Sequence, residues 1–349
     1  MGDMLRPLVL NVLTCSATVL ILGVLALPAR SVVDRPHASG PDRTAATPPS
    51  PRPAQRPRRV FGVYVDPWHV DDWARAVGAA PQAVAKFEAF SRDRTVGSWS
   101  TEARRQGIRR LLISWEPWAP VPAGLGVAAQ AAPQRGYRNI DIARGEQDRY
   151  IFRFARSLAR FPGTVYLRYA HEMNGYWYPW SRDARSYRWA WQRVVRIFHV
   201  VGARNVRFVW SVNPNLYQRR RAWLRGLRRY WPGDRYVDEV GSTMIDFGGV
   251  KNYPVARFAP RLRTLREQFH KPVILTETNT DYDGRLTWLA DLRRALRRMP
   301  WIRGVMWSQL PSRGNAHRTG AGYLDWDVQR DPLAAADLAA IIRDGTRSR

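Results

Sequence analysis

Hydrophobic residues recur between residues 60 and 345 in two alternating patterns, one typical of strands and one of helices. Short apolar runs rich in branched and aromatic residues indicate buried strands, whereas apolar residues spaced three and four apart indicate helices. Strands are predicted at Val60–Val65, Thr95–Trp99, Ile108–Trp115, Thr164–Ala170, Val206–Val212, Val237–Ile245, Pro272–Glu277 and Ile302–Trp307. Helices are predicted at Pro81–Asp93, Gly145–Phe161, 186–203, Ala222–Tyr230, Val255–Phe269, Arg285–Arg298 and Pro332–Arg343.

Eight strands with interleaved helices predict an α/β protein whose strands close into a (β/α)8 barrel, the TIM-barrel fold. The catalytic ends of such barrels are built from the carboxyl ends of the strands and the loops that follow them. The Pro-, Gly- and Ala-rich stretch 119–140 is a long loop, so we expect it at the mouth of the site.

The most informative stretch begins at the strand from Thr164. His171 and Glu172 stand where the strand stops, and four aromatic residues and a proline follow between 176 and 180. A carboxyl group at a strand end, walled by aromatic rings, suits a site that binds a sugar and protonates its glycosidic oxygen. Taken alone, the stretch also fits a salt-bridged pair beside an aromatic core.

A second carboxylate, Glu277, lies at the end of a short apolar strand that starts at Pro272. By the strand count, Glu172 ends the fourth strand and Glu277 ends the seventh. The two carboxylates would then face each other across the barrel mouth. Retaining glycosidases hold such a pair about 5–5.5 Å apart, one as acid/base and one as nucleophile.

Two motifs carry a resemblance to a known family. The first reads Arg168-x-x-His171-Glu172-Met-Asn-Gly-x-Trp177-x-x-Trp180, and the second reads Lys271-Pro272, an apolar run, and Thr276-Glu277. They resemble the acid/base segment and the nucleophile strand of glycoside hydrolase family 26, the β-mannanase family. The resemblance covers residues 60–342. It implies a retaining, endo-acting (β/α)8 hydrolase of a β-linked, mannan-like polysaccharide, with Glu172 as acid/base and Glu277 as nucleophile.

Further side chains are candidates for binding the sugar. Arg168 lies an even number of residues before Glu172, so both should point to the same side and Arg168 should reach a carboxylate. His171 is a candidate to orient the nucleophile or to bind a sugar hydroxyl, and Trp307 to stack below the reacting sugar. The remaining candidates lie at strand ends or in the aromatic stretch: Trp115, Trp118, Asn174, Trp177, Trp180, Trp210 and Asn213, with Asp66 and Glu116 as weaker polar candidates.

One position departs from the family pattern. The family usually has a tyrosine at the end of strand six, but the alignment places Ile245 there, and Tyr253 is the next tyrosine. Both glutamates remain, so a hydrolase stays the main hypothesis. A non-catalytic carbohydrate-binding barrel and a transglycosylase stay open as alternatives. The segment Tyr323–Trp326 again resembles the closing part of the family.

The chain is strongly basic, with a formal net charge of +27 over 349 residues. Nearly all of this charge is arginine scattered over several predicted helix faces, which suits either a solvated surface or attraction to an anionic glycan or a membrane surface. There is no nucleic-acid recognition motif, so we predict no nucleic-acid partner. Cys15 is the only cysteine and the six histidines lack metal-binding spacing. We therefore predict no metal, no cofactor and a monomer.

The amino-terminal residues predict export. Residues 1–29 include an uncharged apolar run from residue 7 that is long enough for a signal peptide or a membrane anchor. Residues 30–59 hold seven prolines and form a predicted disordered linker before the 60–345 catalytic domain. We expect an extracellular or cell-surface protein, either anchored or secreted.

Overall fold

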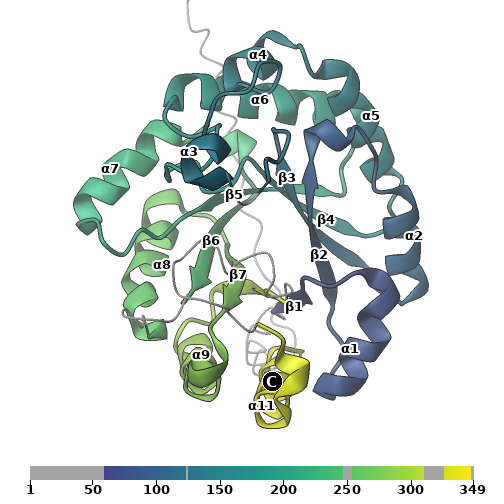
Figure 1. The fold of residues 1–349 in the computed structure, drawn as a ribbon, viewed down its shortest axis with the longest axis vertical. Helices are drawn as coiled ribbons and strands as arrows, with labels where there is room; N and C mark the ends of the chain where they lie inside the picture. Colours follow the sequence, from purple (N-terminus) through teal and green to yellow (C-terminus); the bar gives the residue numbers. More distant parts are fainter. Residues whose placement is uncertain (1–58, 123–124, 247–253, 310–325, 347–349) are drawn as a thin grey trace, which may run out of the picture. The chain divides into compact units, whose positions relative to one another are not determined.

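The computed structural model describes residues 59–122, 125–246, 254–309 and 326–346, and in them eight parallel strands close into a barrel (Figure 1). Each strand pairs with its sequence neighbours, and β1 pairs with β8 to close the sheet. The strands are β1 (Val60–Val63), β2 (Ala83–Ala89), β3 (Arg110–Glu116), β4 (Thr164–Tyr169), β5 (Val206–Val212), β6 (Glu239–Ile245), β7 (Val273–Asn279) and β8 (Ile302–Trp307). The predicted (β/α)8 barrel is confirmed.

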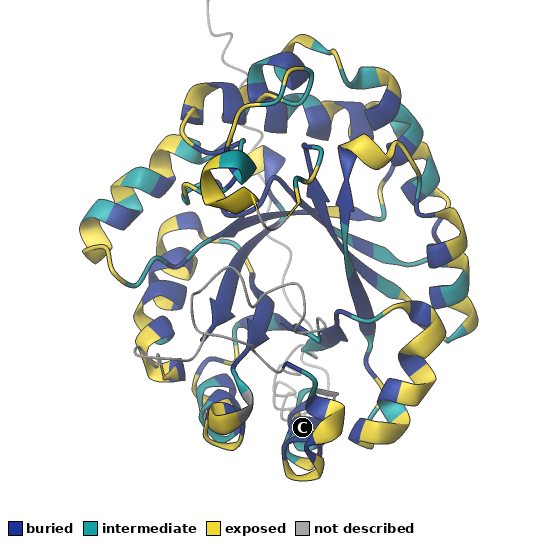
Figure 2. Ribbon diagram, in the orientation of Figure 1, coloured by how far each residue is buried: buried dark blue, intermediate teal, exposed yellow. Residues whose placement is uncertain are grey.

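Helices surround the strands and turn their exposed faces outward (Figure 2). They are α1 (Val70–Val77), α2 (Gly97–Arg105), α3 (Gly126–Gln130), α4 (Asn139–Arg144), α5 (Asp148–Ala159), α6 (Ala184–Val201), α7 (Arg220–Tyr230), α8 (Val255–Phe269), α9 (Arg285–Arg298) and α11 (Pro332–Thr346). The predicted loop 119–140 therefore contains a short helix, α3, and the start of α4. Its residues 123–124 lie outside the described part of the chain.

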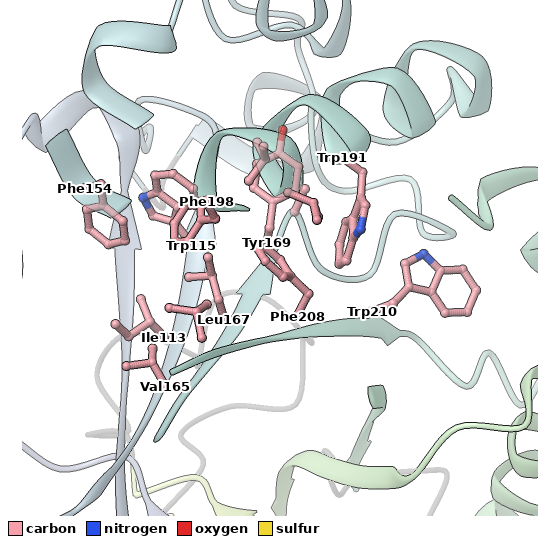
Figure 3. Packing of buried hydrophobic residues seen from close by; sticks show 14 of the residues in the cluster. Ile113, Trp115, Phe154, Val165, Leu167, Tyr169, Trp191, Phe198, Phe208 and Trp210 are labelled. Carbon is pink, nitrogen blue, oxygen red and sulfur yellow. The ribbon is translucent and has the colours of Figure 1, made fainter. Parts of the chain in front are cut away.

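The hydrophobic core lies mainly between the strands and the helix ring. Outward-facing residues of β3 and β4, such as Ile113, Val165 and Leu167, pack against α5 and α6 in one large buried cluster (Figure 3). A smaller cluster inside the barrel contains Leu112 and Met306. Because both faces of these parallel strands are buried, their sequences read as continuous apolar runs.

Two predicted elements near the amino end were wrong. Residues Ala83–Ala89 form a strand where a helix was expected, and Gly97–Arg105 form a helix where a strand was expected. Val84, Phe87 and Phe90 are spaced as on a helix, but this strand is buried on both faces and so lacks an alternating pattern. Helix α1 was not predicted. The predicted number of strands is still correct, because the wrongly predicted strand Thr95–Trp99 is replaced by the strand Ala83–Ala89.

Strand β7 contains a β-bulge next to the predicted nucleophile. Ser242 of β6 pairs with Leu275, but the next residue, Thr243, pairs with Glu277, so Thr276 is an extra residue. The pairing of β7 with β8 shifts over the same stretch. A bulge re-aims the side chains around it, and here it lies at the end of the barrel where the site is expected. The strand also continues beyond Glu277 to Asn279.

The predicted leader (residues 1–29) lies outside the described residues, as does the linker (30–59) except for Arg59. Within the described residues, no helix combines the length and the apolar composition that a membrane crossing requires.

Candidate active site

A buried arginine organises the centre of the barrel. The side chain of Arg168, on β4, is fully buried and donates to hydroxyls from three other strands: Ser114 (3.1 Å), Ser211 (2.9 Å) and Thr243 (3.1 Å). Its Nη1 also lies 2.6 Å from Oε1 of Glu277. A guanidinium has five donors in a fixed plane, so these partners fix its orientation. The expected contact between Arg168 and one of the two candidate carboxylates, Glu277, is present.

The β7 bulge explains how Glu277 reaches this arginine. The Oγ1 atom of Thr276 lies 2.8 Å from Oγ of Ser211, inside the barrel. Side chains of consecutive strand residues normally point to opposite faces. Since Thr276 is the extra residue, both it and Glu277 turn inward.

The electrostatics of Arg168 follow from its surroundings. Burial alone lowers the pKa of its guanidinium, but the acidic groups around it, above all Glu277 and also Glu172, outweigh this effect, so the net pKa shift is upward. Burial, and next the charge of Glu277, raise the pKa of the Tyr64 phenol. Tyr64 therefore stays neutral and donates to the backbone oxygen of Thr276 at 3.1 Å. Arg168 is the permanent cation beside Glu277.

Glu172 is held differently. Its Oε2 accepts from Nε1 of Trp177 at 3.0 Å, and its Oε1 accepts from Nδ2 of Asn213 at 3.2 Å. Asn174 links the loop after β4 to the loop after β5. It donates to the backbone oxygen of Asn213 (2.8 Å) and accepts from the backbone nitrogen of Asn213 (2.9 Å). Neutral donors therefore orient Glu172, whereas a guanidinium is in direct contact with Glu277.

The backbone between β4 and Glu172 adopts an uncommon conformation. Ala170 and Glu172 both have positive φ angles, 43° and 53°. Residues other than glycine rarely adopt this region, and they do so mainly where the surrounding structure imposes it. Here the Glu172 backbone nitrogen donates to the oxygen of Ser211 at 2.8 Å. This bond to β5 fixes the direction in which Glu172 leaves the strand.

His171 belongs to an aromatic cluster at the edge of the site. Its Nε2 lies 3.0 Å from the Tyr178 hydroxyl and 4.0 Å from Oε1 of Glu116. Trp180 stacks on Tyr178 and donates to the His171 backbone oxygen at 2.7 Å. Trp118 packs edge-on against both rings and donates to Glu116 at 3.2 Å. The described contacts link His171 to Tyr178 and Glu116. Its expected role, to orient the nucleophile or to bind a sugar hydroxyl, stays a prediction.

Three tryptophans proposed to face the sugar lie in the core instead. Trp115, Trp210 and Trp307 are fully buried. Trp115 stacks on Phe154 of α5, and Trp210 packs on Phe269 of α8. Trp307 belongs to the cluster that joins β1, β7 and β8 to the helices outside them. These rings stand on the outward face of their strands, so the role of Trp307 as a platform below the sugar is corrected to a packing role.

The structure also shows the surroundings of Ile245 and of Asp66. Ile245 is the last residue of β6, where it pairs with Asn279 and packs against Trp326. The departure from the family pattern at this strand end therefore stands. Tyr253 and residues 323–325 lie outside the described part of the chain. Asp66 is exposed after β1, and the described contacts give it only a backbone bond to His69.

The sequence prediction missed the small hydroxyl residues around Arg168 and the role of Tyr178. Ser114, Ser211 and Thr243 occupy inward positions on neighbouring strands at the level of Arg168. Inward positions can be found by counting in twos from Arg168, but the barrel register must be known to relate one strand to the next. Among the described residues, no group of three or more His, Cys, Asp or Glu side chains is arranged to hold a metal ion.

Sequence comparisons relate part of this chain to one family of glycoside hydrolases. Residues 154–270 match the sequence model of glycosyl hydrolase family 26, a span that contains Glu172 and ends before Glu277. The family resemblance is thereby confirmed over the span that carries the first motif, and the second motif, Lys271–Glu277, lies beyond that span. Two curated relatives are Endoglucanase H of Acetivibrio thermocellus, 26% identical over 201 residues, and a β-1,3-xylanase of a Vibrio species, 27% identical over 178 residues. These matches cover 54% and 49% of this chain but only 20% and 35% of the relatives.

Solved structures show the same fold. A family 26 β-mannanase from Bacteroides ovatus superimposes with a TM-score of 0.53 and 18% identity, over 83% of this chain and 90% of that one. An endo-β-1,4-mannanase from Cellulomonas fimi gives 0.56 and 15% identity, over 83% and 72%. At these identities the likeness establishes the barrel.

Proposed function

We propose that this protein is a retaining glycoside hydrolase that cleaves a β-linked polysaccharide, with Glu172 as acid/base and Glu277 as nucleophile. The observation that carries the proposal is the contrast between the two carboxylates. Glu277 forms an ion pair with buried Arg168, while Glu172 accepts hydrogen bonds from Trp177 and Asn213. An adjacent cation favours the ionised form that a nucleophile requires.

The chemistry has two steps. A Glu277 oxygen forms a bond to the anomeric carbon, and the bond to the leaving oxygen breaks as Glu172 donates a proton to that oxygen. In the second step a water molecule attacks the same anomeric carbon while Glu172 accepts a proton from that water. The bond between the anomeric carbon and Glu277 then breaks. Two inversions leave the configuration at the anomeric carbon unchanged.

The buried positions of both groups support this assignment. Glu172 and Glu277 are 7% and 8% exposed, so they are largely removed from water but still accessible at the mouth. Hydrogen bonds and charges act more strongly in such an environment than in bulk water. The aromatic cluster of Tyr178, Trp180 and Trp118 packs around His171, the residue that precedes Glu172.

The proposal is tested with the full chain and a panel of β-mannans, β-glucans, xylans and acidic polysaccharides. Release of reducing ends is measured for wild type, Glu172→Gln and Glu277→Gln. Each variant should lose at least about 10³-fold in kcat/KM, since each removes one essential step. The anomer of the first product, observed by NMR, should have the configuration of the substrate.

Glu102→Gln, a substitution in α2, is the matched control and should retain full activity. Full activity in either active-site variant would refute the assignment, as would an inverted product. Longer oligomers without a net increase in reducing ends would show a transglycosylase. Binding without any product across the panel would instead support a non-catalytic carbohydrate-binding barrel.

The substrate and location are part of the proposal. A mannan-like substrate is supported by the family motifs, while the curated relatives are named for glucan and β-1,3-xylan cleavage. Export to the cell surface or beyond rests on the apolar character of residues 7–29.

A further inference from the structure

A cavity lies at the opposite end of the barrel from the two glutamates. It is lined by residues that precede β7 and β8 and by the end of α8, and its volume is about 620 Å³. Pro272 immediately precedes β7, and Trp301 immediately precedes β8. Because the strands are parallel, these amino ends lie away from the carboxyl ends that hold Glu172 and Glu277.

The lining combines positive charge with one flat aromatic surface. Arg266, Lys271 and Arg303 contribute the charge and His270 an imidazole, and none of the described Asp or Glu residues lines the cavity. Trp301 is partly buried, and the Arg266 guanidinium lies 5.1 Å from its ring centroid. This cation–π contact holds Arg266 against the ring.

The backbone places two of these groups in specific positions. Ile302 of β8 pairs with Val273, but Gly304 pairs with the next residue of β7, so Arg303 is an extra, bulged residue. Such a bulge redirects the side chain that it carries. His270 ends α8 in the left-handed conformation, with φ at 51°, which reverses the chain at the cavity rim.

Nearby acidic groups leave most of this positive charge uncompensated. Lys271 Nζ donates to a backbone oxygen, that of Asp234, at 2.8 Å, so this contact does not neutralise its charge. The charge of Arg303 acts on the Glu239 carboxyl, but Glu239 forms its salt bridge with Arg207, at 3.3 Å. Arg266 and Lys271 are therefore available for an anion.

We propose that this cavity is a second, non-catalytic carbohydrate site that binds an acidic sugar residue bearing a carboxylate. The arginine and lysine would bind the carboxylate, and Trp301 would pack against the apolar face of the sugar ring. The volume is in the range of pockets that enclose small ligands. The choice of a sugar over another anion rests on the proposed hydrolase function.

The test is calorimetric binding of a glucuronic acid oligosaccharide to the full chain carrying Glu277→Gln, so that turnover is absent. The cavity variant combines Arg266→Gln with Lys271→Gln, and leaves Arg303 in place beside buried Glu239. Its matched control combines Arg196→Gln with Arg225→Gln, exposed residues of α6 and α7 with the same loss of charge. The cavity variant should bind about tenfold or more weakly, and the control within about twofold of the parent.

Each other outcome overturns the proposal. Equal losses in both double variants would show unspecific attraction to a basic surface, and no loss would exclude the cavity. Equal binding of neutral manno-oligosaccharide would exclude an acidic sugar. Tighter binding of inorganic phosphate or of a single-stranded oligonucleotide would identify a simple oxyanion site or a nucleic-acid site. Because the binding test uses a chain without turnover, a failure here overturns only the second carbohydrate site, whereas the activity panel decides the proposed hydrolase function.

Discussion

A single cation, Arg168, has two tasks, because it joins four strands of the barrel and balances the charge of Glu277. A buried charge is costly unless it is paired and fully hydrogen-bonded, and removal of one partner from a buried ion pair costs about 3–5 kcal/mol. The hydroxyls of Ser114, Ser211 and Thr243 meet this requirement. The geometry of the site therefore depends on buried hydroxyl residues as well as on the two glutamates.

Arg168→Lys should separate these two tasks. Lysine keeps a positive charge but has no planar fork, so it cannot reach Glu277 and all three hydroxyls together. We expect kcat/KM to fall about 10- to 100-fold and the free energy of unfolding to fall by about 1.5–3 kcal/mol. The measurements are steady-state kinetics and urea denaturation.

The pH dependence of kcat/KM distinguishes an effect of Arg168 on Glu277 from a purely structural role of Arg168. A weaker ion pair favours ionised Glu277 less, so the acidic limb of kcat/KM should move to higher pH in Arg168→Lys. The control Arg196→Lys, on the exposed face of α6, should change neither the profile nor the stability. An unchanged acidic limb alongside reduced stability would assign Arg168 a purely structural role.

At the scale of elements, the short helix α4 depends on one carboxylate. Asp141 is buried and accepts from Arg138 Nε (2.7 Å), Arg138 Nη2 (2.6 Å) and the Gly136 backbone nitrogen (2.9 Å). Hydrogen bonds from Arg138 lower the pKa of this carboxyl below its usual range, against the opposing effect of burial. The stabilisation is present above the unfolded-state pKa, about 4, and is lost as the pH falls through the lower folded-state pKa.

Asp141→Asn should therefore lower the free energy of unfolding at neutral pH, and this loss should be smaller at acidic pH. We expect a loss of about 1.5–3 kcal/mol near pH 7, from the charged hydrogen bonds. The difference from wild type should shrink as the pH falls below about 4. Guanidinium denaturation across this pH range measures it, with exposed Asp71→Asn as control. A difference that stays constant down to low pH would contradict an ionic origin.

The elements also show which parts of the structure the sequence can predict. The strands around Arg168 and Glu172 were correctly located, because apolar runs between turn residues mark them clearly. Strand β2 was misread because a doubly buried strand loses its alternation. Trp115, Trp210 and Trp307 were placed at the correct strand ends, but a tryptophan on either face of a parallel strand gives the same apolar signal. The β7 bulge depends on the register with β6, which no local pattern reveals.

At the scale of the whole molecule, the formal net charge of +27 should act before any specific contact forms. Charge spread over a surface raises the association rate with an oppositely charged partner, whereas contacts in a cavity mainly slow dissociation. The association rate constant for an immobilised acidic polysaccharide should thus fall about tenfold between about 0.05 M and about 0.5 M NaCl. Surface plasmon resonance on the Glu277→Gln chain measures this rate without turnover.

The controls separate the whole surface from the basic cavity. A neutral β-mannan should associate at a rate that is nearly independent of salt, because screening acts only on charged pairs. The Arg266→Gln and Lys271→Gln double variant removes two of 56 basic residues, so it should keep most of the salt dependence of association while it dissociates faster. If the acidic polymer associates at the same rate at every salt concentration, the basic surface has no part in recruiting it. If instead the double variant loses the salt dependence, the field that attracts the polymer comes from the cavity alone.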